Sequence, residues 1–541
     1  MHALKKIALA ATGLLAATTL AACADSANSA GGGDAGGKTI TMVVPDTSWS
    51  FAIDNGFGGS EPTINVQGTL LRKPYVEASS GGALQQNVDE FEGYLAESYE
   101  VSDDGLVYTF TLSDAVSQAG NEITTDDVLW SWERRINSPR SVSMSVQAPM
   151  ITSMDQFAKI DDKTFTITIE RAGYGVTMLA LLSDLTAHVY DSTLLKEHAT
   201  DDDPYAVEWS ATNVNHGFGP YEVVDLQPNA QVTLKAREDF VLGKPDVDTI
   251  IMKVVPDAGT RANAVRSGDA DLASGLQPAD LVELAEGEGT TVPVIDNPNA
   301  YVLMPLVTNK APFDDVAVRQ AFGYAVPYEA IVEDVYQGKA VRNGPSFLRR
   351  DRPGYDGSGF TDFAYDPAKA KQMLADAGYP DGVEFTITVS AAYPDIRETA
   401  IQIQTAAKEA GFEIEINQVP DAAYAAGRVD HTFQAFIVRD WPITLSPSYE
   451  LLVYTAEGGS NNLADWEDPD FYAALEKGYE EADPFSEAAG KAWNAAERIY
   501  VNEAPILFIA QIQPNVAMSD DVGGFAWRSD NQLDFSQLTK S

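Results

Sequence analysis

The stretch Gly31 to Thr39 reads GGGDAGGKT, and from Gly32 it matches the G-x-x-x-x-G-K-T pattern of a phosphate-binding loop. In such a loop, backbone N–H groups surround the phosphates, a strand leads in and a helix leads out. Here the preceding residues are small and polar, and the following TITMVVP, Thr39 to Pro45, is β-branched and apolar, which favours a strand. Both flanks are wrong for nucleotide binding, so we interpret the Gly-rich segment as a flexible tether.

Motifs of an enzyme are also missing. The sequence holds neither the G-x-S-x-G turn of a serine hydrolase nor the H-E-x-x-H pattern of a zinc peptidase. Five histidines occur, and apart from His2 they are far apart in sequence: His188, His198, His216 and His431. We therefore expect no enzyme, no cofactor and no metal site, and nothing supports a hydrolase built on scattered carboxylates.

The single cysteine follows an apolar N-terminal segment. Lys5 and Lys6 form a short positive region, Ile7 to Leu20 is apolar or small, and Leu20-Ala21-Ala22 precedes Cys23. A run this short, with these flanks, is typical of a secretory signal and not of a membrane span. The segment resembles a bacterial lipoprotein signal, which implies that Cys23 is lipidated and becomes the mature N-terminus. The alternative is an ordinary signal with an incidental cysteine.

A lipidated Cys23 would anchor the chain. Each buried CH₂ of an acyl chain contributes about 0.8 kcal/mol, so several chains hold an N-terminus at a membrane surface. The sequence thus predicts a signal peptide over 1–22, a flexible tether over 23–38, and a protein held at the outer face of the bacterial cell membrane. Without a second cysteine, neither a disulfide nor a Cys-based metal site is expected.

Length and charge restrict the remaining classes. A chain of 541 residues exceeds what one hydrophobic core organises, so two or three lobes are expected, and 45% hydrophobic residues suffice for sizeable cores. The net charge is −44, or −46 once Lys5 and Lys6 leave with the signal (−44 − 2). Such a charge repels nucleic acid and anionic lipid. The acidic residues are scattered, which indicates a solvated surface.

Strand and helix patterns alternate along the chain. Threonines and apolar residues alternate in Val107 to Ser113 and in Thr164 to Ile169, as in half-buried strands. Thr124-Thr125-Asp126-Asp127 begins a helix, with hydroxyl caps followed by acids that the helix dipole favours. The stretch YEVVDLQPNAQVTLKA predicts a hairpin with Pro228-Asn229 at its turn.

Two later stretches predict β-α-β units. In the first, a strand over Asp248 to Val255 precedes a helix from about Pro256 to Ser267. In the second, a strand over Val383 to Val389 precedes a helix from about Asp395 to Ala410. A glycine follows and ends each helix, and a further strand comes next. Two separate α/β lobes fit these units.

Five blocks cover most of the mature chain: LAESYEVSDDGLVYTFTL with ITTDDVLWSWERRINSP (Leu95 to Leu112, Ile123 to Pro139), then Gly217 to Phe240, Lys244 to Leu272, Ala311 to Ala340 and Tyr365 to Gly382. The first has a strand, an Asp-Gly turn, a strand and a helix with Trp-Glu. In this order the blocks resemble one family, the extracytoplasmic solute-binding proteins of ABC importers (family 5), in the group that includes oligopeptide- and dipeptide-binding proteins.

The resemblance implies an α/β, two-lobed, periplasmic-binding-protein-like (type II) fold that closes on a ligand, with the chain crossing twice between lobes. It also implies an extra subdomain inserted in the first lobe. We expect lobe I over 38–75, 205–292 and 507–541, the inserted subdomain over 76–204, and lobe II over 293–506. The partners it implies are an ABC permease with its ATPase subunits, and we expect a monomer.

In peptide-binding relatives, a buried Asp near a block like FIVRDWPITLSPSYELL meets the α-amino group of the ligand. Here the resemblance gives that role to Asp440, flanked by Arg439 and Trp441. A desolvated ammonium needs a paired carboxylate, which suits a cation in a closed cleft. The alternative is that Asp440 pairs with Arg439 or caps a loop.

The chain departs from the dipeptide-binding pattern at several positions. Relatives carry an arginine for the ligand carboxylate after a strand like VEFTITV, where Arg397 is nearest here but is expected inside a helix. A family Asn corresponds to Val307, and the family Gly-Thr-Gly-Pro is Gly217-Phe218-Gly219-Pro220. A longer peptide, or a small solute with an amine or amide and an apolar body, is therefore also open.

Further ligand contacts are expected from residues whose blocks face the cleft in relatives. Ligand pockets are mostly apolar with a few placed polar groups, which suits this set, although packing in the core is the alternative for each aromatic residue. The candidates are Trp49, Phe51, Phe218, Tyr301, Asn461 and Asn462.

These features together predict the substrate-binding receptor of an ABC importer, which captures a peptide or another amine- or amide-bearing solute. Two alternatives stay open. One is a binder of a non-peptide solute in the same fold, such as a small aromatic amide or hydrazide, an oligosaccharide or a nickel complex, with His216 and His431 the first candidate ligands for a metal. The other is a surface sensor or adhesive lipoprotein without transport.

Overall fold

The computed structural model describes residues 37–46, 51–52, 60–138, 150–342, 344–347, 355–442, 445–459, 461–481, 483 and 485–541. The chain divides into two compact units, Met1–Gly37 and Lys38–Ser541, and every described helix and strand belongs to the second. The expected signal peptide, Cys23, nearly all of the tether and Trp49 lie outside the described residues. None of the described helices is both long and apolar enough to cross a membrane.

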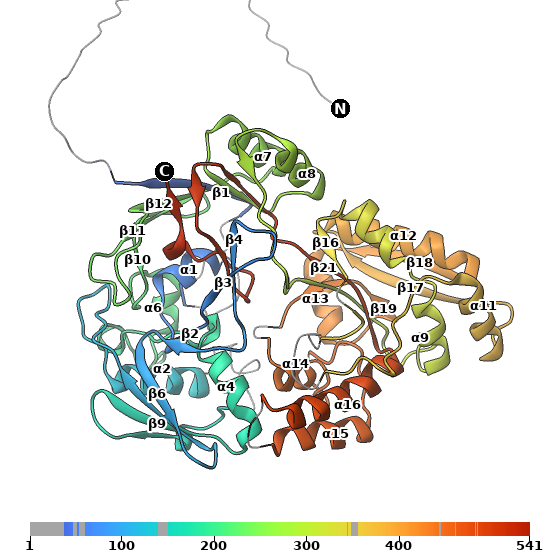
Figure 1. Ribbon diagram of the computed structural model, residues 1–541, viewed down its shortest axis with the longest axis horizontal. Helices are drawn as coiled ribbons and strands as arrows, with labels where there is room; N and C mark the ends of the chain where they lie inside the picture. The colour runs from blue at the N-terminus through green and yellow to red at the C-terminus, as the bar shows by residue number, and fades with distance from the viewer. Residues whose placement is uncertain are drawn as a thin grey trace, which may run out of the picture. The chain divides into compact units, whose positions relative to one another are not determined.

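A seven-stranded mixed sheet, the first sheet, has the order β10-β11-β12-β1-β13-β22-β14 (Figure 1). In it β1 runs parallel to β12 and to β13, and the helices α7 and α8 pack against β13 and β22. The short helices α1 and α6 come before β10 in the chain. The elements are β1 (Thr39–Val44), β10 (Tyr221–Gln227), β11 (Gln231–Ala236), β12 (Thr249–Val254), β13 (Leu272–Ser274), β14 (Thr290–Thr291), β22 (Val516–Ser519), α1 (Ser60–Val66), α6 (Val207–Thr212), α7 (Ala258–Ser267) and α8 (Pro278–Glu286).

Local sequence signals place several of these elements. The predicted hairpin is confirmed, because β10 and β11 pair antiparallel and Asn229 at the turn has φ +61°, which asparagine tolerates well. Helix α7 starts after Asp257, whose side chain accepts a hydrogen bond from the Thr260 backbone N–H, and it ends at Gly268 with φ +79°. The helix expected at about 256–267 is therefore confirmed to within two residues.

A second group of strands forms two further sheets. The four-stranded second sheet has the order β16-β21-β15-β20, and a three-stranded parallel sheet has the order β18-β17-β19. Helix α12 joins β17 to β18, as the sequence predicts. The strands are β15 (Tyr301–Pro305), β16 (Ala340–Val341), β17 (Val383–Ser390), β18 (Phe412–Val419), β19 (Ala435–Phe436), β20 (Val438–Asp440) and β21 (Ile506–Ile512). The helices are α9 (Val316–Gly323), α10 (Tyr328–Ala330), α11 (Pro367–Asp376), α12 (Pro394–Ala407) and α13 (Asp421–Val429).

Two short segments connect the first and second sheets. Residues 292–300 lead from β14 to β15, and residues 513–515 lead from β21 back to β22. The boundary expected at 507 falls inside β21, which pairs along β15 from Tyr301 to Pro305. The return to the first sheet therefore comes at 513–515, because breaking the ladder earlier would leave its backbone groups unpaired.

The segment expected as an insertion contains its own antiparallel sheet, in the order β6-β7-β9-β8. Helix α2 begins after Thr124, which confirms the helix start that the sequence predicts, and Thr124 and Asp127 form a capping box there. The elements are β6 (Ala96–Val101), β7 (Val107–Leu112), β8 (Phe157–Lys159), β9 (Thr164–Thr168), α2 (Thr125–Asn137), α4 (Gly175–Leu181) and α5 (Ser192–Lys196).

Residues at the expected start of the insertion pair with the C-terminal stretch instead. Strand β4 (Ala83–Gln86) lies between β3 (Tyr75–Glu77) and β24 (Phe525–Trp527), parallel to β24. The boundary at 76 thus cuts through β3. Two more strand pairs complete the fold: β2 (Leu71–Arg72) with β5 (Glu92–Gly93), and β23 (Val522–Gly523) with β25 (Thr539–Lys540).

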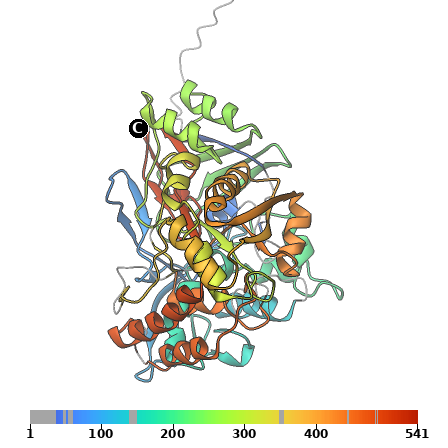
Figure 2. The same cartoon turned by 90° about the vertical axis from the view of Figure 1, so that its right-hand side faces the viewer.

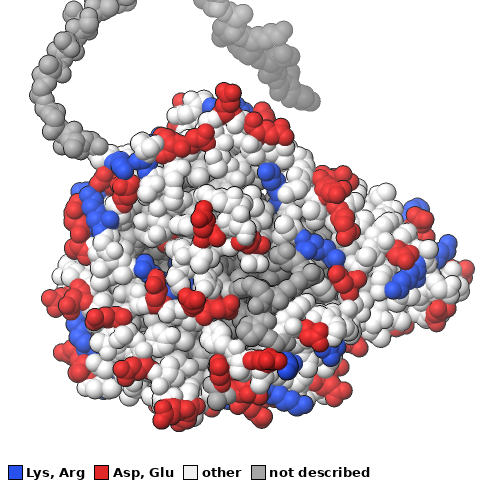
Figure 3. Space-filling view, in the orientation of Figure 1, with Lys and Arg blue, Asp and Glu red and all other residues white. Residues whose placement is uncertain are grey.

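Three helices, α14 (Pro447–Val453), α15 (Pro469–Tyr479) and α16 (Glu487–Glu503), lie in the chain between β20 and β21 of the second sheet, with α15 and α16 side by side at the foot of Figures 1 and 2. Their contact is close, because a Cβ on Gly478 would lie 2.2 Å from the Trp493 ring. Figure 3 shows Asp and Glu side chains spread over one face of the molecule, in agreement with a solvated acidic surface.

One carboxylate lies in the interior of this helical region. Glu497 on α16 is fully buried, and its Oε1 accepts a hydrogen bond of 3.1 Å from the Phe347 backbone N–H. Its Oε2 has no hydrogen-bond partner among the described residues. Burial raises the pKa of Glu497 from 4.5 to about 7, against hydrogen bonds from Ser346 and Phe347 that lower it. The folded protein therefore holds this proton more tightly than the unfolded chain does.

We predict that Glu497→Gln raises the melting temperature at pH 8 by about 3 °C and at pH 5 by less than about 1 °C. The raised pKa makes ionised Glu497 destabilising above pH 7, by roughly 3 kcal/mol, and this cost disappears as the pH falls toward 4.5. About 500 folded residues unfold with an entropy of roughly 1 kcal/mol per kelvin, which converts the energy to temperature. Calorimetry at both pH values measures it, with exposed Glu480→Gln as the control, and equal shifts at the two pH values would contradict the prediction.

Candidate functional site

A cavity of about 460 Å³, the inter-sheet cavity, lies between the first and the second sheet. Its walls come from both: Val44, Met252, Ser274 and Val516 of the first sheet, and Arg439, Asp440 and Ile512 of the second. The residues that connect the sheets, Gln513 to Asn515, also line it. The cavity is therefore bounded by two separately built sheets and by one of the segments that join them.

More acidic than basic side chains line the cavity among the described residues. Asp46, Glu61 and Asp440 supply three carboxylates, and Arg439 supplies the one basic side chain among the described lining residues. Burial raises the pKa of Glu61, and the charges of Asp46 and Asp530 raise it further. Among the described lining residues, the cavity thus brings three acidic side chains together with one basic side chain.

Asp440 stands at the end of β20, opposite Tyr301 on β15. Its Oδ1 accepts a hydrogen bond of 2.8 Å from the Trp441 backbone N–H, and its Oδ2 lies 3.7 Å from the Arg428 guanidinium on α13. Burial raises its pKa, while Arg428 and hydrogen bonds from Trp441 and Tyr454 lower it. With 19% of its side chain exposed, the carboxylate remains accessible from the cavity.

Arg439 does not pair with Asp440. Successive residues of a strand point to opposite faces, so the two neighbouring side chains diverge. The Arg439 Nη2 lies 2.6 Å from Asp395 Oδ2, which also accepts a hydrogen bond from the Tyr336 hydroxyl, and the guanidinium lies 5.3 Å from the Tyr393 ring centroid. Arg439 is thus already neutralised by Asp395, and Asp440 keeps only the weaker contact with Arg428.

Of the three aromatic residues that line the cavity, Tyr393, Trp441 and Trp527, two are well exposed. Trp441 and Tyr393 both line it, and their exposed fractions are 39% and 40%. Large aromatic surface left exposed beside carboxylates offers a stacking face for the apolar body of a ligand. Of the aromatic candidates from the sequence, the structure brings Trp441 together with Asp440 and Arg439.

The other described aromatic candidates lie in hydrophobic cores. Phe51 and Phe218 are exposed by 2% and 1% and do not line the inter-sheet cavity. Tyr301 is buried against Phe347 and Phe508, in edge-to-face geometry at 5.6 and 6.0 Å between ring centroids. These residues pack the elements around the site, because large apolar rings gain most from full burial.

The two asparagines lie outside the cavity lining as well. Asn462 is buried, and its amide holds a local turn: Nδ2 donates to the Trp466 carbonyl at 2.8 Å, and Oδ1 accepts from the Trp466 N–H at 3.1 Å. Asn461 is half-buried beside it. The side chain of Asn462 is therefore occupied in positioning its own loop.

The remaining residues that the sequence analysis named, Arg397, His216 and His431, do not lie together in one site. Arg397 is exposed on α12, which confirms its helical placement. His216 contacts Gln67 at 3.1 Å, and His431 lies 3.4 Å from Asp465. Within the described ranges, no three His, Cys, Asp or Glu residues are grouped so that they could hold a metal ion.

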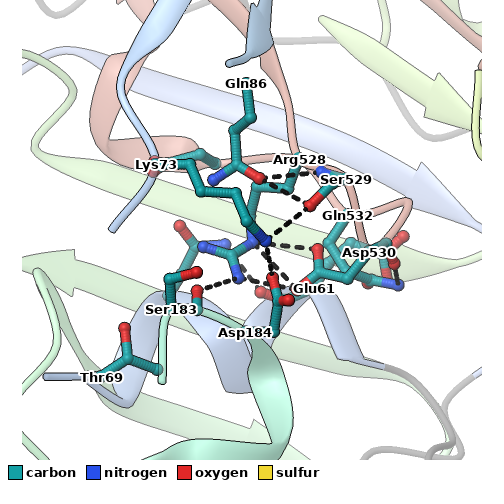
Figure 4. A network of polar contacts seen from close by, with 12 residues as sticks. Glu61, Thr69, Lys73, Gln86, Ser183, Asp184, Arg528, Ser529, Asp530 and Gln532 are labelled. Atoms are coloured by element: carbon teal, nitrogen blue, oxygen red, sulfur yellow. Dashed lines mark hydrogen bonds and ion pairs between the residues drawn. The ribbon is translucent and has the colours of Figure 1, made fainter. Parts of the chain in front are cut away.

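A buried polar network lies close to Glu61 (Figure 4). The Lys73 Nζ donates to Asp184 Oδ1 at 2.6 Å and to Ser529 Oγ at 3.1 Å, and neither Lys73 nor Asp184 is exposed. Arg528 binds Asp530 through Nε and Nη2, with a shortest distance of 2.7 Å. Burial raises the pKa of Asp184 against the opposing charge of Lys73. These internal pairs leave the network with its charges compensated.

Sequence analysis missed three acids. Asp46 follows β1, and the carboxyl end of a parallel strand is where ligands commonly bind, which could have pointed to it. Glu61 begins a short helix and carries no such signal. Asp395 lies 44 positions before its partner Arg439, so that pairing depends on the packing of α12 against the strands.

Comparisons with known proteins agree with this architecture. A model of the bacterial extracellular solute-binding proteins, family 5 Middle, matches residues 90–462. Heme-binding protein A of Haemophilus influenzae is 29% identical over 551 aligned positions that cover 95% of each chain. The dipeptide-binding protein of Escherichia coli is 30% identical over 60% of this chain and 62% of its own length.

A solved structure shows the same fold. The periplasmic binding protein DppA from Helicobacter pylori, in complex with the peptide STSA, matches with a TM-score of 0.75 at 21% identity, over 93% of this chain and 98% of that one. The fold is accordingly the α/β fold of periplasmic binding proteins. The chain belongs to the bacterial extracellular solute-binding proteins of family 5, non-enzymatic extracytoplasmic proteins that capture a solute for an ABC importer.

Proposed function

We propose that this protein captures a solute with a cationic amine, most simply a peptide with a free N-terminus, in the inter-sheet cavity and delivers it to an ABC permease. The observation that carries the proposal is Asp440, a partly accessible carboxylate with incomplete charge compensation on the cavity wall. An ammonium beside Asp440 would exchange its hydration for a charge-assisted hydrogen bond, and it would relieve the repulsion among the acids of the wall.

The charge of the cavity favours a peptide over a haem-like ligand. Heme-binding protein A is named for a ligand that carries two carboxylates, whereas three carboxylates line the cavity of this chain. Like charges brought together in a desolvated site repel strongly. The peptide STSA bound by DppA has the free amine that Asp440 would accept. A volume of about 460 Å³ is within the range of sites for small molecules and short peptides.

A second candidate is an amine-bearing solute without a free carboxylate. Arg439 is engaged by Asp395, and Arg397 is exposed on α12 outside the cavity lining. The Arg439 guanidinium lines the cavity, but its charge is already paired with Asp395, so a ligand carboxylate would find no free counter-charge among the described lining residues. This observation supports an amine or amide with an apolar body that stacks on Trp441, in the same site.

We further propose that the parts built on the first and second sheets act as two lobes that close on the solute. The connecting segments 292–300 and 513–515 would act as hinges, because only they lead from one sheet to the other along the chain. Ligand contacts on both walls would then stabilise the closed form over the open form. Cys23 would carry the lipid anchor, with the Gly-rich residues up to 38 as the tether.

The Asp440→Asn variant tests the binding role. We predict at least 30-fold weaker affinity for an amine-bearing peptide by titration calorimetry, since losing one partner of a desolvated charge pair costs about 2 kcal/mol or more. Its melting temperature should not fall, because burial already disfavours the ionised carboxylate. Asp430→Asn on the exposed end of α13 is the matched control. Equal affinities of the two variants would remove Asp440 from the site.

The affinity for an amine should also fall when the pH is lowered through the pKa of Asp440. Burial raises the pKa of Asp440 above 3.8 in the free protein, and a bound ammonium favours its ionised form. Affinity for a peptide amine is therefore constant between that pKa and the pKa of the ligand's own amine, about 7.7 to 8, and it falls as the pH drops through the pKa of Asp440. Calorimetry between pH 4 and pH 7 measures this fall, which should be smaller in Asp440→Asn, and an affinity that rises on acidification over this range would contradict the account.

Replacement of Cys23 tests the anchor. In a bacterial host, Cys23→Ser should move the protein from the membrane fraction to the soluble extracytoplasmic fraction, because the serine hydroxyl does not accept the lipid carried by the thiol. Ser29→Ala, in the same tether, should stay with the membrane. A Cys23→Ser protein that remains in the membrane fraction, with an unchanged mass by mass spectrometry, would show that no lipid is attached there.

A further inference from the structure

A second, smaller cavity lies next to the inter-sheet cavity. Its volume is about 240 Å³, and its polar lining includes Gln85, Gln86, Asn87, Asn299 and Ser529; we call it the polar chamber. Trp527 lines both the chamber and the inter-sheet cavity, so the two spaces meet at one indole. One wall is part of the connecting segment 292–300.

The chamber contains a buried acceptor without a donor. Asn299 is 2% exposed, and its Nδ2 donates to the carbonyl oxygens of Pro442 at 2.8 Å and of Ser529 at 2.6 Å. These two acceptors fix the orientation of the amide, because a flipped amide would set its oxygen against both carbonyls. Within the part of the chain that the structure describes, the Asn299 Oδ1 has no hydrogen-bond partner. Buried acceptors are nearly always paired, so this one calls for a donor.

The charged residues of the chamber are satisfied by the protein itself. Asp296 accepts hydrogen bonds from the Ser79 N–H at 3.1 Å and from Gln85 Nε2 at 2.7 Å. Arg528 is bound by Asp530 through two nitrogens. A charged ligand group would find no free counter-charge among these residues and would lose its hydration. The chamber therefore suits an uncharged group that donates a hydrogen bond.

The polar network of Figure 4 holds this wall in place. The Gln86 Oε1 accepts from the Ser529 N–H at 2.9 Å and from its Oγ at 3.1 Å, and Lys73 also donates to that Oγ. Because Ser529 is fixed from both sides, its carbonyl holds Asn299 in turn. The acceptor is thus preorganised, which lowers the entropy cost of binding a donor.

The chamber and Asp440 are within reach of one short solute. Asn299 lies two residues before Tyr301, which limits their Cα separation to about 7 Å. Tyr301 is the cross-strand partner of Asp440, about 5 Å away in an antiparallel pair. The two groups are therefore no more than about 12 Å apart between Cα atoms.

We propose that the polar chamber is a second ligand subsite, which accepts an amide N–H or a hydroxyl at Asn299 Oδ1 from the solute whose amine is held at Asp440. The proposal rests on the proposed function and adds a requirement for a neutral hydrogen-bond donor a short distance from the amine.

Two amines of matched shape test whether the polar chamber adds to the binding of a solute held at Asp440. They are 6-aminohexanamide, and 6-methylheptan-1-amine with a branched alkyl end in place of the amide. We expect the amide to bind about tenfold more tightly to the mature protein by calorimetry, because it pairs the buried acceptor. Equal affinities would overturn the subsite. In Asp440→Asn both amines should weaken alike with the ratio kept. Unchanged affinity of both amines in this variant would show failure of the proposed function, whereas the ratio of the two affinities tests the chamber separately.

A chamber-filling variant and a soak complete the test. Val76 lines the chamber and is 43% exposed, so Val76→Trp should fill it without loss of folding and bring the ratio close to one. Val101→Trp, on β6 and 45% exposed, is the matched control and should keep the ratio. Crystals soaked in acetamide should show its N–H donating to Asn299 Oδ1 even if neither amine binds. Water alone at that position, or an unchanged ratio in Val76→Trp, would overturn the proposal.

Discussion

A carboxylate held between two sheets without full charge compensation is the constraint on which the site depends. Asp440 is removed from bulk water, and its nearest cation, Arg428, stays 3.7 Å away. Such a group gains most when a further cation enters the cavity. The negative charge of Asp46 and Glu61 on the facing wall acts in the same direction. The site is therefore prepared for a positive solute before the solute arrives.

Strand geometry separates the two opposite charges at positions 439 and 440. Because β20 turns Arg439 toward Asp395 and Asp440 toward Arg428, the arginine is paired at 2.6 Å while the aspartate keeps a longer contact of 3.7 Å, although both residues line the cavity. The same strand fixes Asp440 opposite Tyr301, whose buried ring anchors β15. A one-residue slip of β20 would exchange the directions of the two side chains and break both pairings.

Local signals in the sequence were enough for much of the fold. The helix start at Thr124, the turn at Asn229 and the β-α-β unit around α12 all depend on residues close together in sequence, and all are confirmed. The pairs that build the site depend on contacts between distant segments. Lys73 meets Ser529 across 456 positions, for which no local pattern exists. An aromatic residue such as Phe218 can pack in a core or line a pocket. The residue type alone does not distinguish the two, so its burial could not be predicted from the sequence.

The most direct test of the account is a thermal-shift screen of the mature chain, residues 24–541, with peptides of two to eight residues. Each peptide is offered once with a free N-terminus and once with an acetylated one, which removes the positive charge and adds one small acetyl group. At a hundred times its Kd, a ligand adds about 2.7 kcal/mol, or about 3 °C for a protein of this size. The account predicts shifts only from free amines. Equal shifts from the acetylated partners would contradict it, since the carboxylate at Asp440 would then have no role in choosing the solute.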